Sequence, residues 1–358
     1  MRPATGGIRR HVSDLLEHLD RRQFLPLLVA PENFVPDRPL SDLAFYPVEI
    51  GAVTRPIQDY EAVLKLAQLL RGKCDLLHAH GLRGAVVGGF AARRARLPYL
   101  ITVHNLLPKM NFVQATVVLE LARRAARVIA VSEAVAHTLR LIGVGAAQIS
   151  VVPNGVDLSR FELPIDTASW RKENGFEAGE RIVLAVGRLA QEKGFDVLIE
   201  AFAILQARMP DARLVIVGDG PEASRLKAQA ELSSDRIRFL GHLSDTARLF
   251  AAADLVAVPS RQEGQGIVPL EAMAAGRAVV ASRVGGLVES IVEGTTGLLV
   301  PADDARVLAG TMELLLNDPN RRAAMGAAGQ RRAEQEYSLQ TQLQKIEAIY
   351  SDVFRHTA

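Results

Sequence analysis

Short apolar runs alternate with helix-periodic segments along the whole chain, and this alternation restricts the fold more than any other feature. The candidate strands of the first half are 25–30, 45–50, 75–79, 99–103, 127–131 and 149–152. Those of the second half are 182–186, 214–217, 237–240, 255–258, 278–281 and 297–300. Strands that are apolar throughout and separated by helices are typical of a parallel sheet covered on both faces. We therefore expect an α/β protein.

The length of 358 residues is sufficient for two hydrophobic cores, and two similar α/β halves follow one another. Residues 161–180 are polar and irregular, which predicts an inter-domain linker between a first domain over 1–160 and a second from 181. Helical patterns over 303–336 and 339–355 end the chain.

A glycine turn, Gly6-Gly7, leads into the first helical pattern, and no strand precedes it. In a doubly wound domain such a turn follows the first strand, which is normally central. We expect that this strand is missing, through a misassigned start or its loss, and that the sheet has a gap there.

The composition of the chain indicates the cellular compartment and the charge of each half. The lone Cys74 leaves no intramolecular disulfide, and neither a bilayer-spanning run nor a signal-peptide core is apparent. We expect a cytoplasmic protein. Residues 1–160 carry 20 Lys+Arg and 13 Asp+Glu, a net charge of +7, against −5 for the remainder.

Two arginine clusters contribute to this basic half, and they consist of Arg93, Arg94, Arg96, Arg123, Arg124 and Arg127. They indicate either ordinary surface variation or peripheral contact with an anionic acceptor or the inner membrane face. Nucleic acid is not expected, because aromatic residues are not interleaved with the arginines.

The stretch 257–276 reads as a strand end, a glycine-rich loop and a short helix. Gly264 and Gly266 allow backbone to approach a ligand closely, and free N–H groups at a helix start suit phosphate oxygens. The carboxylates of Glu263 and Glu271 suit sugar hydroxyls, so the loop predicts a ligand that is part phosphate and part sugar. The alternative for Glu271 is an ordinary first-turn glutamate, contributing about 0.3–1 kcal/mol through the helix dipole.

Arg188 and Lys193 flank a turn that follows strand 182–186 and leads into a helix. Two cations at the carboxyl end of a parallel sheet could neutralise a diphosphate leaving group, although surface cations at a helix start are the alternative. His104 also ends a strand, where we expect it to be accessible and able to donate to a sugar or phosphate. We do not expect His78 and His80 to bind metal, because no cysteine or spaced carboxylate accompanies them.

As a set, these motifs resemble those of the retaining glycosyltransferases of family 4, and the resemblance runs essentially from end to end. The motifs are Gly6-Gly7, His104, Pro153-Asn-Gly-Val-Asp157, Gly187-Arg188, Lys193-Gly194, Gly218-Asp-Gly220, Phe239-Leu-Gly241, Pro259–Gly264, Glu271–Gly276 and Gly285-Gly286. The resemblance implies a GT-B fold of two facing Rossmann-like domains. It also implies that residues 339–358 return to the first domain, which leaves 181–338 as the second.

The resemblance further implies that a sugar moves from a nucleotide-diphospho-sugar to an acceptor with retention at the anomeric carbon. Arg188 and Lys193 would bind the diphosphate with the backbone of Gly6 and Gly7, and His104 would contact the donor near the reacting centre. Glu271 would bind the ribose and Leu240 the base, whereas the donor sugar would be held by Glu263, Gly264, Gln265, Gly266, Ile267 and Val268. Gln265 departs from the phenylalanine that many members carry.

No Asp-x-Asp motif occurs in the chain, so neither a metal at the diphosphate nor any other cofactor is expected. The acceptor, a glycan, a lipid-linked molecule or a small molecule, is left open. Two alternatives remain: a GT-B-type nucleotide-sugar epimerase, and a truncated non-catalytic protein that binds sugar nucleotides.

Overall fold

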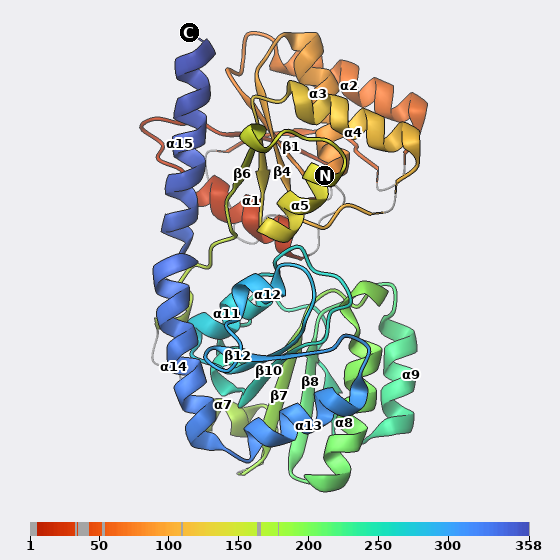
Figure 1. Ribbon diagram of the computed structural model, residues 1–358, viewed down its shortest axis with the longest axis vertical. Helices are drawn as coiled ribbons and strands as arrows, with labels where there is room; N and C mark the ends of the chain where they lie inside the picture. Colours follow the sequence, from red (N-terminus) through yellow and green to blue (C-terminus); the bar gives the residue numbers. More distant parts are fainter. Residues whose placement is uncertain are drawn as a thin grey trace. The chain divides into compact units, whose positions relative to one another are not determined.

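The structure is a computed structural model that describes residues 6–32, 34, 43–51, 54–108, 110–162, 166–177 and 179–357. The chain divides into two compact units: unit 1 is Met1–Asn154 with Gln340–Ala358, and unit 2 is Gly155–Leu339 (Figure 1). Both units consist of parallel strands and helices, which confirms the predicted fold class.

The sheet of unit 2 has six strands in the order β12 (Gly297–Val300), β11 (Val279–Ser282), β10 (Leu255–Val258), β7 (Arg181–Val186), β8 (Ala212–Val217) and β9 (Ile237–Phe239). All neighbouring strands are parallel. The order is that of a doubly wound sheet, and it reverses between β7 and β10. Ligands of such folds bind outside the carboxyl ends of the strands at this switch point.

Helices cover both faces of this sheet because alternate strand residues point to opposite sides. In β7, Val183 and Ala185 pack against one cluster, and Ile182 and Leu184 against the other. The first cluster includes α8 (Phe195–Arg208) and α13 (Ala305–Leu316), while the second includes α10 (Ala247–Ala252), α11 (Val268–Ala274), α12 (Leu287–Ser290) and α14 (Pro319–Glu336) (Figure 1). Helix α9 (Ala223–Ser233) packs beside α8.

The helical stretch expected over 303–336 is two helices, α13 and α14. The break falls at Asp318-Pro319, where the Asp318 carboxylate accepts a hydrogen bond from the Arg321 N–H and Pro319 begins the new helix. Pro suits the first turn of a helix and cannot continue a preceding one.

The stretch expected to be a linker is packed into unit 2. It carries the end of α6 (Ser159–Glu162) and all of α7 (Thr167–Glu173). Trp170 stacks on Phe176 at 6.0 Å between ring centroids, and the Arg171 guanidinium donates to Asp254 over 2.8 Å. The division into units falls after Asn154 rather than after residue 160.

Unit 1 contains two separate parallel sheets among its described residues. One pairs β1 (Leu27–Ala30) with β2 (Ala44–Pro47), and the other has the order β3 (Leu77–His80), β4 (Tyr99–Val103), β5 (Arg127–Ala130) and β6 (Ile149–Val151). The helices are α1 (Gly7–His18), α2 (Pro56–Leu70), α3 (Gly81–Ala95), α4 (Phe112–Arg124), α5 (Glu133–Leu141) and α15 (Leu339–Thr357). Among the described residues, no strand pairs the β1–β2 sheet with the β3–β6 sheet.

Helix α15 belongs to unit 1 almost throughout. The Tyr350 hydroxyl lies 2.7 Å from Nδ1 of His78 on β3, and Arg127 on β5 forms an ion pair with Asp352 at 3.3 Å. Residues 340–358 therefore return to the first unit. Among the residues the structure describes, no helix combines the length and apolar character needed to cross a bilayer.

Candidate functional site

Two loops meet at the switch point of unit 2. Strands β7 and β10 are parallel neighbours, with Val183 opposite Leu255, so the loops that follow them start at the same sheet edge. The first loop contains Gly187, Arg188 and a 3₁₀ turn, and the Arg261 N–H of the second donates to the Glu192 carbonyl over 2.9 Å. The motifs that sequence analysis singled out 70 residues apart are thus brought together.

The Lys193 ammonium lies 2.5 Å from a carboxylate oxygen of Glu263. The Ser260 hydroxyl donates to the same oxygen over 3.2 Å, and Glu263 is 9% exposed. Arg188, by contrast, is exposed and forms no ion pair or hydrogen bond through its side chain with the described residues. The two predicted phosphate-binding cations therefore differ: one is already paired with a carboxylate, and the other is available to an anion.

Close backbone contacts make glycine necessary at this edge. Gly194 has φ +65°, and a Cβ there would lie 2.1 Å from the Pro259 carbonyl oxygen. A Cβ on Gly286 would lie 2.0 Å from the Gly264 carbonyl oxygen, which holds the loop after β10 against the Gly285-Gly286 turn. A side chain at Gly194 would push its loop away from Pro259, and a side chain at Gly286 would push its turn away from Gly264.

Glu271 has a partner that sequence reasoning missed. The Arg160 guanidinium donates to its carboxylate over 3.0 Å and to Asp245 over 3.3 Å. The Arg160 and Glu271 side chains are only 8% and 11% exposed. Arg160 lies in α6, within the polar stretch beside the expected linker, and nothing in its local sequence distinguishes it from a surface arginine.

The other residues of the predicted sugar-binding loop lie between Glu263 and α11. Gln265 is 2% exposed, and Gly266 has φ +81°, a conformation that favours glycine. Ile267 is the N-cap of α11, which begins at Val268 and has only seven residues.

Leu240 follows β9, and its N–H donates to the Ile216 carbonyl over 3.0 Å, which leaves it at the carboxyl edge of the same sheet.

In unit 1, the predicted turn before the first helix is present. Gly6 is the N-cap of α1 with φ +101°, and no side chain caps the helix. Gly7 is the first helical residue, so the free N–H groups of a twelve-residue helix begin at this turn.

A histidine cluster covers one face of the β3–β6 sheet. His78 and His80 are two residues apart in β3, so they point to the same face of the sheet. Thr102 lies opposite His80 in β4. Because strand residues two apart share a face, His104, two residues beyond Thr102, extends the same row. His11 of α1 joins it, with its ring centroid 4.7 Å from that of His104.

His104 was expected to be accessible, and this is wrong: it is only 9% exposed. Burial also lowers the pKa of His11 to about 4, partly opposed by its hydrogen bond to Asn154, and the pKa of His78 to about 3. The pKa values of His80 and His104 lie well below 6.5 for the same reason, helped by neighbouring histidines. All four rings are therefore neutral near pH 7.

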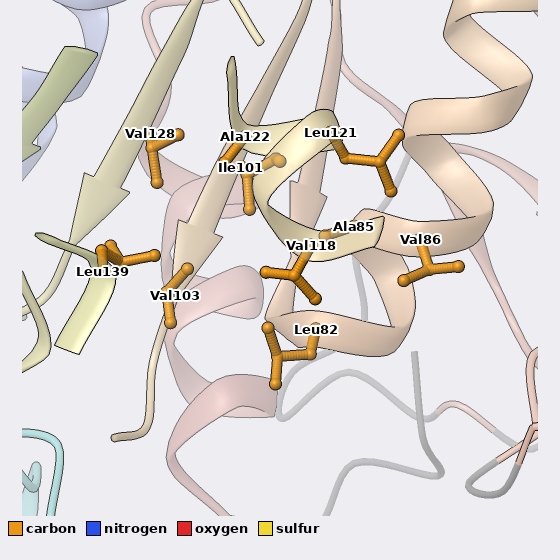
Figure 2. A pocket seen from close by; sticks show the side chains of 10 residues that line it. All are labelled: Leu82, Ala85, Val86, Ile101, Val103, Val118, Leu121, Ala122, Val128 and Leu139. Atoms are coloured by element: carbon orange, nitrogen blue, oxygen red, sulfur yellow. The ribbon is translucent and has the colours of Figure 1, made fainter. Parts of the chain in front are cut away.

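Figure 2 shows an apolar hollow in unit 1, toward which Leu82, Val103 and Val118 point from α3, β4 and α4. Its volume is about 10 Å³, close to the size of one water molecule, and all its lining residues are apolar. The hollow is a packing gap rather than a site for a phosphate or a sugar.

The cations and buried carboxylates lie at the switch point of a doubly wound sheet, the place where nucleotide-binding folds of this class hold their ligands. Residues 5–160 match the profile of Glycosyltransferase Family 4, and residues 166–332 match that of Glycosyl transferases group 1. The chain belongs to the family 4 glycosyltransferases.

Curated relatives agree with this membership. The chain is 33% identical to a D-inositol 3-phosphate glycosyltransferase of Pseudarthrobacter chlorophenolicus over 80% of this chain and 72% of that protein. It is 41% identical over 52% of its length to a GDP-mannose-dependent monoacylated alpha-(1-6)-phosphatidylinositol monomannoside mannosyltransferase of Corynebacterium glutamicum. The chain spans about half the length of the latter (52%) and 64% of the D-inositol 3-phosphate glycosyltransferase of Nocardia farcinica.

Solved structures share the fold. Anabaena HepE in complex with UDP and glucose matches 98% of this chain and 97% of its own, with a TM-score of 0.87 at 26% identity. Sucrose-phosphate synthase from Thermosynechococcus elongatus covers 99% of this chain and 97% of its own, with a TM-score of 0.85 at 26% identity. These matches extend over nearly the whole chain, and the GT-B fold class is confirmed.

Proposed function

We propose that the protein transfers a sugar from a nucleotide-diphospho-sugar to an acceptor with retention at the anomeric carbon. The observation that carries this proposal is the meeting of the Arg188–Lys193 turn with the Glu263 loop at the switch point of unit 2. Arg188 is exposed and forms no ion pair with the described residues, and its loop meets the loop that carries the buried Glu263 carboxylate. This combination suits a ligand that contains both a diphosphate and hydroxyl groups.

Each residue of unit 2 then has a role in the proposal. Arg188 stabilises the charge that develops on the leaving diphosphate, and Lys193 shares this task while pairing with Glu263. Glu263 and the backbone from Gly264 to Val268 hold the donor sugar, and Glu271, oriented by Arg160, accepts from the ribose hydroxyls. The backbone around Leu240 contacts the base.

In unit 1, Gly6, Gly7 and His104 are assigned to donor binding by the family resemblance. The neutral His104 ring can either donate or accept one hydrogen bond at each nitrogen, as a sugar hydroxyl or phosphate oxygen requires. A phosphate oxygen of the leaving group receives the acceptor proton, so we propose that transfer needs neither a carboxylate base nor a divalent metal at the diphosphate.

The donor base is uracil or guanine in this proposal, since HepE is solved with UDP and the mannosyltransferase is GDP-mannose-dependent. The acceptor is a glycan, a lipid-linked molecule or a small molecule used in building the cell envelope. Exposed Arg93, Arg94, Arg123 and Arg124 end the neighbouring helices α3 and α4, and this basic surface supports contact of a cytoplasmic enzyme with an anionic membrane.

A thermal-shift screen of UDP-, GDP- and ADP-sugars tests the proposal. We expect one nucleotide class to raise the melting temperature of the wild type and not of Arg188→Ala. Equal shifts in both proteins would contradict the assigned site. Rapid release of free sugar without acceptor would instead favour an epimerase, and binding without any turnover would favour a non-catalytic protein.

A further inference from the structure

Three histidine side chains of unit 1 converge from different elements. His11 lies on α1, His80 ends β3, and His104 follows β4. Each offers one ring nitrogen, and the three nitrogens lie within 4.8 Å of one another. Sequence analysis considered His78 and His80 alone and did not find this group, because His11 is separated from them by about 70 residues of chain.

The spacing of two of these histidines already suits a metal ion. His80 Nδ1 lies 3.2 Å from His104 Nε2. Two imidazole nitrogens bound to one tetrahedral Zn²⁺ at about 2.0–2.1 Å stand about 3.3–3.4 Å apart. Only His11 would need to move closer, and by no more than about 1.5 Å on the same reckoning.

His11 supplies the third ring nitrogen, and polar neighbours of its other ring nitrogen fix the orientation of the ring. Its Nδ1 lies 3.1 Å from Asn154 Oδ1 and 3.0 Å from Gln342 Nε2, whereas its Nε2 is buried and has no hydrogen-bond partner among the described residues. The ring is only 4% exposed. The two neighbours favour different tautomers: Nδ1–H can donate to Asn154 Oδ1, or an unprotonated Nδ1 can accept from Gln342 Nε2. Metal binding through Nε2 uses the first tautomer, whose proton on Nδ1 leaves a lone pair on Nε2, as metal-binding histidines are usually held. A bound cation would satisfy an atom that is otherwise costly to bury.

His78 is not a fourth ligand. Its Nδ1 lies 2.7 Å from the Tyr350 hydroxyl and its Nε2 lies 2.7 Å from the Thr102 hydroxyl, so both ring nitrogens are occupied. Its ring centroid lies 4.2 Å from that of His80, and this packing holds the His80 ring in place. The fourth position of a tetrahedral site would be filled by water.

We propose that His11, His80 and His104 bind one borderline divalent cation of the Zn²⁺ type. Three imidazoles suit Zn²⁺, Cu²⁺, Ni²⁺ or Co²⁺, whereas Mg²⁺ and Ca²⁺ prefer oxygen ligands. The proton shared between His80 and His104 moves to the other nitrogen of its own ring, so each imidazole stays neutral and no proton is released. All three ligands lie in unit 1, and one of them, His104, is also the histidine that the proposed function assigns to the donor. Cation binding is measured without donor or acceptor, so its failure is distinguishable from a failure of the proposed glycosyl transfer.

Co²⁺ is the probe, because four-coordinate Co²⁺ absorbs visible light far more strongly than hexa-aqua Co²⁺. Untagged, chelator-treated protein is titrated with Co²⁺ and then with Zn²⁺ or Mg²⁺. We expect one Co²⁺ per chain, a strong visible absorption, and its loss when Zn²⁺ but not Mg²⁺ is added. No saturable binding, or only the weak absorption of six-coordinate Co²⁺, would overturn the proposal.

Three variants locate the ion. His80→Ala and His11→Gln are expected to weaken Co²⁺ binding at least about tenfold and to abolish the strong absorption. His137→Ala, which removes an exposed histidine of α5, is the matched control and should bind as the wild type does. Melting temperatures measured in chelator identify a variant that fails to fold. If one ligand variant fails to fold, Co²⁺ binding by the other ligand variant tests the proposal. Wild-type binding in either folded ligand variant would overturn the proposal, as would loss of binding in His137→Ala.

Discussion

The Lys193 ammonium and the Glu263 carboxylate form an ion pair at 2.5 Å across the switch point of unit 2. Sequence reasoning assigned these side chains to different parts of the donor, the diphosphate and the sugar. Their pairing makes them one unit, in which the lysine holds the carboxylate in place and the carboxylate reduces the positive charge available to phosphate. In the proposed reaction, Arg188 is therefore the principal cation for the leaving group.

Replacing Arg188 by alanine should lower turnover by about 10²-fold or more, because the proposed role of this cation is to bind the diphosphate and to stabilise the further charge that develops as it leaves. Steady-state kinetics with the preferred donor measure this loss. The matched control is Arg248→Ala, which replaces an exposed arginine of α10 outside the proposed site and should keep wild-type turnover. Equal turnover in wild type and folded Arg188→Ala would contradict the assignment.

Lys193→Ala should lower turnover on a similar scale and, unlike Arg188→Ala, destabilise the protein by about 1–3 kcal/mol, since it leaves the buried Glu263 carboxylate without its cation. Adding Glu263→Gln removes the uncompensated charge and should recover part of that stability. Chemical denaturation of the two single variants and the double variant measures the coupling. Strictly additive effects would show that the pair is not energetically linked.

Arg160→Ala should cost about 3–5 kcal/mol, because Arg160 and Glu271 form a buried pair and the carboxylate would remain without its partner. Arg140→Ala breaks an exposed pair with Glu133 and should cost no more than about 1 kcal/mol. Denaturation midpoints of the two variants provide the comparison. Similar small losses in both would mean that Arg160 does not hold Glu271.

Gly194→Ala should destabilise unit 2 more than Gly241→Ala. Both glycines have left-handed φ values, +65° and +68°, so both substitutions carry a strain of about 1–2 kcal/mol. Only at Gly194 does the new Cβ meet the Pro259 carbonyl oxygen, whereas Gly241 has open space. Melting temperatures test this order, and a smaller loss for Gly194→Ala would contradict the close approach of the two loops.

Chelation should leave turnover unchanged, because in the proposed reaction side chains rather than a metal neutralise the diphosphate. Added Zn²⁺ should instead inhibit, since its proposed ligand His104 is also the proposed donor contact. Turnover assays in EDTA, and then with Zn²⁺ in excess of EDTA, measure both effects. A requirement for Mg²⁺ would overturn the metal-free reaction, and inhibition that persists undiminished in His80→Ala would place the inhibitory ion elsewhere.

The strands of unit 2 could be predicted closely from sequence, because most are mainly apolar runs that glycine or proline follows closely, although β9 contains Arg238. The stretch 255–258 begins and ends as expected, and 297–300 does too. The stretch 161–180 could not be predicted in this way, because its composition is mostly polar. Its helix α7 is nevertheless packed against the core through the large apolar side chain of Trp170.

Side-chain pairing could not be predicted at all. Arg160 and Glu271 lie 111 residues apart, and only the fold determines that they meet. The sequence contains part of the information that places the histidine cluster. His78 and His80 are two residues apart, as are Thr102 and His104, so each pair points to one face of its strand, and the two strands are neighbours. The contribution of His11 depends on how α1 packs on that face, which no local pattern reveals.

Acceptor-dependent turnover tests the central claim most directly. The donor that gives the largest thermal shift is incubated with a panel of glycan, lipid-linked and small-molecule acceptors, and both nucleoside diphosphate and glycosylated product are quantified, with the anomeric configuration of the product assigned by NMR. We predict equal amounts of nucleoside diphosphate and product, retention at the anomeric carbon, and loss of both products in Arg188→Ala. Nucleoside diphosphate release that is unchanged without acceptor, or a product of inverted configuration, would contradict the account.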